Sequence, residues 1–161
     1  VGVYSYGYPG LLDAAAISGN IITGCGSDGI GIEAWSGNYY QPSSIAQLII
    51  KDNIVRSSMG DGIRVESDTD CSIHGILSGN TIVDNLGDGI YLYNSGGVLD
   101  IDLGSDDPSS GGNSIYGNAG WQVNNESGEE VNAQHNWWGQ APENDMFNGE
   151  IVYEPYLEQA P

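Results

Sequence analysis

Acidic side chains recur at one position of a repeated segment, and they are the first residues that could do chemistry. Asp28, Asp61 and Asp88 each precede Gly-Ile, in GSDGIGIE, MGDGIRVE and LGDGIYLY. If the segments stack, the carboxylates lie about 5 Å apart and must be hydrogen-bonded, separated by solvent or bridged by a cation. Ca²⁺ prefers several oxygen ligands, so these aspartates are the predicted metal site. The simpler interpretation is that they cap turns without a metal, and the pattern requires no cofactor.

The residues after each Asp-Gly alternate between apolar and other types, which predicts strands with one buried face. The predicted inward pairs are Ile30 and Ile32, Ile63 and Val65, Ile90 and Leu92, and Trp121 and Val123. One outward column then contains Gly31, Arg64, Tyr91 and Gln122, and the next contains Tyr4, Glu33, Glu66, Tyr93 and Asn124.

This outward face has the chemistry of a glycan site. Sugar rings offer apolar faces to aromatic planes and hydroxyl groups to carboxylates and guanidinium groups. The alternative is that the tyrosines only stabilise the sheet through cross-strand pairs, but an outward Trp35 favours binding. Tyr39 and Tyr40, in the loop after Trp35, are candidates for a groove wall. The predicted carbohydrate-binding residues are Tyr4, Tyr6, Glu33, Trp35, Arg64, Glu66, Tyr91 and Tyr93.

Catalytic residues are harder to identify. The chain has only three basic side chains, and Arg64 between Glu33 and Glu66 is held charged and is a poor base. The carboxylates of Glu33 and Glu66, on adjacent rungs, are expected to lie near the short end of the range of about 5–9.5 Å that separates the paired carboxylates of glycoside hydrolases. Many pairs of surface carboxylates have a similar separation. His74 and His135 have no nucleophile in register. No catalytic residue is predicted.

These side chains must be positioned by a repeated backbone unit. Asn20, Asn53, Asn80, Asn113 and Asn136 follow one another at intervals of 33, 27, 33 and 23 residues. A period of this size indicates a solenoid, and each unit contains three short apolar stretches that predict a coil with three strands. Asparagines stacked at the strand spacing can form a hydrogen-bonded ladder. Asp-Gly predicts a second turn, in which Gly supplies permissive backbone angles and Asp bonds to amides two residues on.

The composition of the chain restricts the classes of partner that it can bind. The formal charge of −19 over 161 residues argues against nucleic acid and anionic membranes. No apolar run approaches the 18 residues that predict a membrane-spanning helix. Cys25 and Cys71 are out of register, so no disulfide is predicted. We expect one domain over residues 1–161, cut from a larger extracellular or cell-surface protein whose other domains are its partners.

The repeated segments resemble the right-handed parallel β-helix proteins of the pectate-lyase-like superfamily. The shared pattern is [IL]-x-[GD]-N-x-[IV] followed by D-G-I-x-[ILV], and the C-terminal NAQHNWWGQAPENDMFNGEIVYEPYL resembles the closing coil of such repeats. The resemblance implies an all-β, right-handed, three-sided parallel β-helix of about five coils. An open solenoid end needs a cap. We assign Trp137, Trp138, Phe147, Tyr153 and Tyr156 to a C-terminal cap.

Function follows less directly, because this fold hosts lyases, hydrolases, epimerases, adhesins and xylan-binding modules. The expected function is a non-catalytic carbohydrate-binding module of a secreted polysaccharide-degrading enzyme, with xylan suggested by the resemblance alone. One alternative is part of a β-helix polysaccharide lyase, hydrolase or epimerase. A second is a cell-surface spacer or adhesin.

Overall fold

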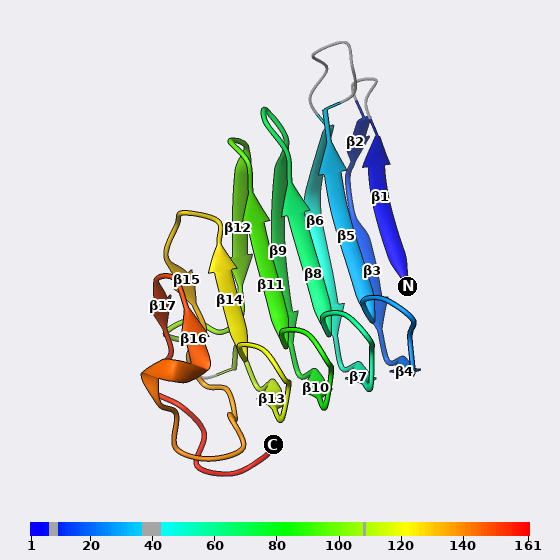
Figure 1. Cartoon of the computed structure of the whole chain (residues 1–161). Coiled ribbons are helices and arrows are strands. Elements are labelled where there is room, and N and C mark those ends of the chain that lie inside the picture. The colour runs from blue at the N-terminus through cyan, green and yellow to red at the C-terminus, as the bar shows by residue number, and fades with distance from the viewer. Residues whose placement is uncertain (7–9, 37–42, 108) are drawn as a thin grey trace.

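The protein is a parallel β-helix, seen in a computed structural model that describes residues 1–6, 10–36, 43–107 and 109–161 (Figure 1). Each turn of the chain passes through three sheets, and equivalent strands lie side by side from the N-terminal to the C-terminal coil (Figure 1). Every strand pairing is parallel. The described part of the chain has no helix that is long and apolar enough to cross a membrane.

The first sheet carries the predicted binding face. Its strands, in spatial order, are β1 (Gly2–Tyr6), β5 (Ile30–Trp35), β8 (Ile63–Ser67), β11 (Ile90–Asn94), β14 (Val123–Glu126) and β16 (Phe147–Asn148).

The second and third sheets complete each coil. The second contains β2 (Gly10–Leu12) and β3 (Ala15–Ser18), which both pair with β6 (Ser43–Lys51), then β9 (Ser72–Ser78) and β12 (Val98–Asp102). The third contains β4 (Ile21–Thr23), β7 (Ile54–Arg56), β10 (Thr81–Val83) and β13 (Ser114–Tyr116). A separate pair is formed by β15 (Val131–Asn132) and β17 (Ile151–Val152), and a short 3₁₀ turn, η1 (Asn144–Met146), precedes β16.

The core is formed by the alternation that the sequence predicts. Ile30, Ile63 and Ile90 are paired on adjacent strands of the first sheet, and all are fully buried. Ile45 and Ile73 extend the core from the second sheet, and Val55 and Ile82 extend it from the third. Stacking therefore buries the apolar face of every coil against its neighbours.

The predicted register is confirmed from β1 to β11 and is wrong in the next coil. The structure pairs Tyr91 with Asn124 and Tyr93 with Glu126, two residues beyond the predicted partners Gln122 and Asn124. The reason is that Trp121 occupies the position of the repeated aspartate. The backbone N–H of Trp121 donates to Asp88 Oδ1 over 2.7 Å, and the Trp121 side chain is 39% exposed instead of inward-facing.

Aromatic side chains close the C-terminal end, as the sequence predicts. Trp138 is buried and packs edge-on against Phe147, with 4.8 Å between the ring centroids. Phe147 stacks on Tyr153 at 4.7 Å, and Tyr156 also packs against the core. Trp137 is half-buried and pairs through its backbone with Ser114. The two cysteines, Cys25 and Cys71, are free thiols in the structure.

Candidate functional site

The outer face of the first sheet brings most of the predicted binding residues together. Arg64 pairs with Tyr91, and Glu66 lies between Glu33 and Tyr93 on neighbouring strands. All of these side chains point outward because the alternate positions of each strand are buried. The pairing of β1 with β5 places the backbone of Tyr4 beside Glu33 and that of Tyr6 beside Trp35. The side chains of Tyr4 and Tyr6, and all of Tyr39 and Tyr40, lie outside the described part of the structure.

A shallow depression at one end of this face lies between two exposed aromatic residues. Trp35, the last residue of β5, is 47% exposed, and Tyr93 on β11 is 38% exposed. Because β8 lies between these strands, and Trp35 lies two residues beyond Glu33, which is level with Tyr93, the two residues are separated diagonally by about 12 Å of sheet. The depression has a volume of about 220 Å³ and is lined by Trp35, Glu66, Ser67, Asp68, Tyr93 and Ser95.

Arg64 is held in the middle of the face by three neighbours. Its Nη1 donates to Asp61 Oδ2 over 3.1 Å, and its Nη2 donates to Glu66 Oε1. The guanidinium carbon lies 4.2 Å from the centre of the Tyr91 ring, which is a cation–π contact. Burial alone would lower the pKa of Arg64, but Glu66 and Asp61 raise it. Arg64 therefore remains a cation and cannot act as a base.

Two other groups on the face keep their protons more tightly than usual. Partial burial and the charge of Glu66 raise the pKa of Glu33. Burial and the hydrogen bond to Glu126 raise the pKa of Tyr91 to about 12. In this bond the Tyr91 hydroxyl donates to Glu126 Oε2 over 3.1 Å, and the Tyr91 ring lies 6.3 Å from that of Tyr93. Tyr91 therefore supports both Arg64 and Tyr93.

Asp68 and Ser95 are site residues that the sequence did not predict. Asp68 accepts hydrogen bonds from the Ser95 hydroxyl over 2.8 Å and from the Ser36 hydroxyl over 3.0 Å. The Ser95 bond and the Thr69 backbone N–H lower the pKa of Asp68, so its carboxylate is a fixed negative charge at the edge of the depression. These residues directly follow the paired ends of β8 and β11, so the register of the repeat extends to them, but the predicted site included only residues of the strands.

The repeated aspartates form a ladder through backbone amides. Asp28 Oδ1 accepts from the Asp61 N–H and Asp61 Oδ1 accepts from the Asp88 N–H, each over 2.8 Å. The predicted bond to an amide two residues on in the same turn is therefore wrong, because the acceptor serves the next coil. Burial raises the pKa of Asp61. Among the described residues, no group of three or more His, Cys, Asp and Glu side chains is placed to hold a metal ion. Calcium binding by the ladder stays a prediction.

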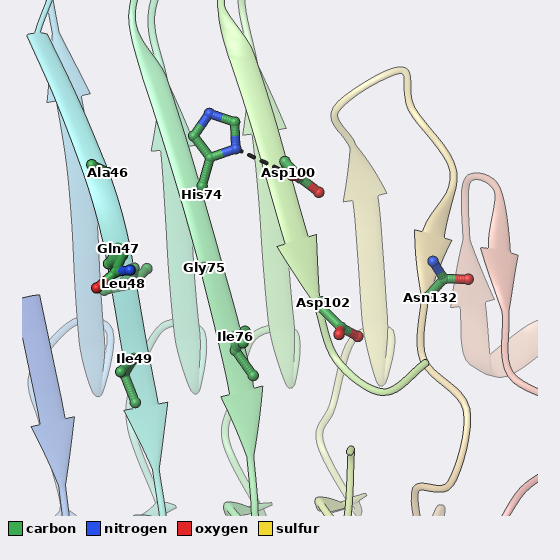
Figure 2. Close-up of a pocket in the computed structure, with 10 residues that line it drawn as sticks. All are labelled: Ala46, Gln47, Leu48, Ile49, His74, Gly75, Ile76, Asp100, Asp102 and Asn132. Atoms are coloured by element: carbon green, nitrogen blue, oxygen red, sulfur yellow. Dashed lines mark hydrogen bonds and ion pairs between the residues drawn. The ribbon is translucent and has the colours of Figure 1, made fainter. Parts of the chain in front are cut away.

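A wider depression, of about 490 Å³, lies on the second sheet (Figure 2). It is flanked by Ile49 and Ile76, and His74 Nδ1 lies 3.1 Å from Asp100 Oδ2 on the adjacent strand (Figure 2). Its described lining contains no Trp, Tyr or Phe. Of these two depressions, the one on the first sheet is therefore the one that offers Trp and Tyr rings for stacking on a sugar.

Comparison with known proteins agrees with the fold. The chain belongs to the family described as "Protein of unknown function (DUF1565)", whose model matches residues 11–144, and this family is associated with parallel β-helix proteins. No protein of curated function and no solved structure matches the chain significantly.

Proposed function

We propose that this chain is a non-catalytic carbohydrate-binding module of an extracellular or cell-surface polysaccharide-degrading enzyme. Its ligand is a plant cell-wall glycan, for which xylan is the first to test. The observation that carries the proposal is the pair of exposed rings, Trp35 and Tyr93, on either side of a depression lined by carboxylates and hydroxyls. Aromatic platforms bind the apolar faces of sugars, and carboxylates accept hydrogen bonds from their hydroxyl groups.

The spacing of the rings suits an extended chain. Trp35 and Tyr93 lie on strands two rungs apart and are offset by two residues along them, a diagonal of about 12 Å that is of the order of one disaccharide unit of a linear glycan. The glycan would then run obliquely to the axis of the β-helix, crossing β8 between the two rings. The described residues of the outer sheet offer no other enclosure, so we expect binding to depend on contacts repeated along a polymer.

Binding without catalysis is favoured by the charged groups on the face. Arg64 is the only Lys, Arg or His among the described residues of the first sheet, and its two carboxylate partners keep it protonated. A lyase would require a neutral base beside the sugar ring, which this guanidinium does not supply. The face is therefore proposed to hold a glycan and not to cleave it.

The test is retention on insoluble xylan, pectin, alginate and mixed-linkage glucan, with released reducing and unsaturated ends measured in the same tubes. Retention by one glycan without new ends supports the proposal. Trp35→Ala and Tyr93→Ala should each weaken that retention at least tenfold, which corresponds to about 1.4 kcal/mol.

Two exposed aromatic residues outside the site serve as matched controls. Trp121 is 39% exposed at a turn before β14, and Tyr116 is 38% exposed on the third sheet. Trp121→Ala and Tyr116→Ala should leave retention within about twofold of the parent. Equal losses in all four variants would place the site elsewhere, new ends would indicate an enzyme, and no retention by any glycan would leave a spacer or adhesin.

A further inference from the structure

We infer that the site between Trp35 and Tyr93 selects neutral glycans and rejects polyuronates, such as polygalacturonate and alginate. This inference rests on the proposed function and specifies its substrate class. It follows from the way in which the carboxylates of the first sheet and its one described cation are arranged around the depression.

The depression itself is negatively charged. Glu66 and Asp68 both line it, between the two aromatic rings. Hydrogen bonds from Ser36 and Ser95 hold the Asp68 carboxylate in its ionised form, at the rim where a sugar substituent would lie. A uronate carboxylate seated on either ring would therefore meet fixed negative charge within the range that salt leaves unscreened, about 8 Å at physiological ionic strength.

The only cation on the face is already neutralised. Arg64 gives one nitrogen to Asp61 and another to Glu66, and its planar face lies on the Tyr91 ring. A uronate that approached this guanidinium would meet the negative charge of both carboxylates, and displacing either one would leave a partly buried acid without its counter-charge. Lys51 and Arg56, the other two basic residues of the chain, lie on β6 and β7, away from the first sheet.

A neutral glycan meets none of these obstacles. Its hydroxyl groups can donate to the carboxylates of Glu66 and Asp68, and charge-assisted hydrogen bonds of this kind are stronger than those between neutral groups. The apolar faces of its rings can stack on Trp35 and Tyr93. The same carboxylates that repel uronates are therefore acceptors for uncharged sugars.

The experiment compares glycans that differ only in charge. Binding of xylan and mixed-linkage glucan is measured beside polygalacturonate and alginate, with a chelator present so that calcium cannot bridge carboxylates. The neutral glycan that binds is then converted into carboxymethyl and hydroxyethyl derivatives of equal substitution. We expect the hydroxyethyl form to bind within about threefold of the parent glycan and the carboxymethyl form at least tenfold more weakly, with the gap closing as salt is raised.

Variants of single carboxylates test whether the selectivity against charged glycans arises at this depression. Glu66→Gln leaves Arg64 with one carboxylate partner, and Asp68→Asn removes the fixed charge at the rim. Each should narrow the gap between the two derivatives at least threefold. Glu130→Gln removes the same charge from an exposed position beside the second sheet and should leave the gap unchanged.

The possible failures are distinguishable. Retention by no glycan at all removes the proposed function. If polygalacturonate or alginate retains the protein in the presence of the chelator, or if the two derivatives bind with equal affinity, the proposed binding function stands but its selectivity for neutral glycans is overturned. An effect of Glu130→Gln equal to that of Glu66→Gln would reduce the selectivity to overall charge, and would also overturn the assignment to this site.

Discussion

The side-chain amide of Asn53 donates a hydrogen bond over 3.0 Å to Oδ1 of Asn80, at the same turn of the next coil. Asn80 Oδ1 also accepts from the Asn53 backbone N–H, so one oxygen serves two donors. The same arrangement joins Asn20 to Asn53, Asn80 to Asn113 and Asn113 to Asn136. The asparagine ladder therefore fixes each coil to the next at a corner where the backbone turns between the second and third sheets.

Removing one buried rung should destabilise the whole stack. Asn80 is 1% exposed, and its amide also donates to the Ile50 carbonyl over 2.8 Å. Asn80→Ala leaves the two donors of Asn53 without their acceptor in a buried site, so we expect the free energy of unfolding to fall by about 3 kcal/mol. Chemical denaturation followed by circular dichroism measures the change.

The exposed end of the ladder supplies the matched control. Asn20 has the same residue type and donates to the same kind of partner, but its side chain is exposed. Water can replace its hydrogen bonds, so Asn20→Ala should cost less than about 1 kcal/mol. Equal losses for Asn20→Ala and Asn80→Ala would show that burial of the ladder is not the source of its contribution.

The glycine of each Asp-Gly pair has a different role from the one predicted. Gly29, Gly62 and Gly89 do not adopt positive φ angles; they lie where the coils approach most closely. A Cβ on Gly62 would lie 2.4 Å from Cγ2 of Ile82 and 2.6 Å from the Gly89 carbonyl oxygen. The sequence pattern identified the position, but only the structure distinguishes a conformational requirement from a steric one.

Gly62→Ala should therefore lower the free energy of unfolding by about 1–3 kcal/mol through overpacking. Gly26→Ala is the control, because a Cβ there has no heavy atom within 4 Å and the backbone does not have a positive φ angle. It should be neutral or slightly stabilising. Thermal melts of the two variants compare the effects, and equal melting temperatures would contradict the steric explanation.

The fold could be predicted because a stacked coil repeats one physical requirement many times. Each coil needs alternating apolar residues and the same asparagine, so Ile30, Ile63 and Ile90 are recognisable without any structure. The predicted strand register is wrong in the coil where that repetition stops. Trp121 follows a glycine as Ile90 does, but it takes the position of Asp88. A single repeat without its aspartate offers two alignments, both of which bury Val123, and the exposure of Trp121 distinguishes the one that forms.

The site was predictable on the strands and not in the loops. Glu33, Glu66 and Tyr93 are placed by strand alternation, which is a local property of the sequence. Asp68 and Ser95 are the residues next after the paired Ser67 and Asn94, so they are in register, but no local pattern encodes the hydrogen bond between their side chains. The hydrogen bonds that set the charge of the depression were therefore visible only after the coils had been stacked.

Two carboxylates of the face should affect stability with opposite signs. The pKa of Glu33 is raised in the folded state, so the folded protein binds this proton more tightly than the unfolded chain. Ionisation of Glu33 then costs stability as pH rises above its unfolded pKa, and Glu33→Gln should be neutral or stabilising at pH 7. The difference from the parent should disappear as pH falls below the unfolded pKa of a glutamate, about 4.3.

Asp68 should behave in the opposite way because its pKa is lowered in the folded state, chiefly by the Ser95 hydroxyl and the Thr69 N–H. The stability that its ionised form contributes is present above the unfolded pKa and is lost as pH falls through the folded one. Asp68→Asn should therefore be destabilising at pH 7 and lose its effect in acid, with a small magnitude because the group is only partly buried and solvent screens its charge. Urea denaturation of the parent and both variants from pH 7 to pH 3 measures the two differences. Variants of Glu33 and Asp68 that change stability with the same sign at pH 7 would contradict this description of the face.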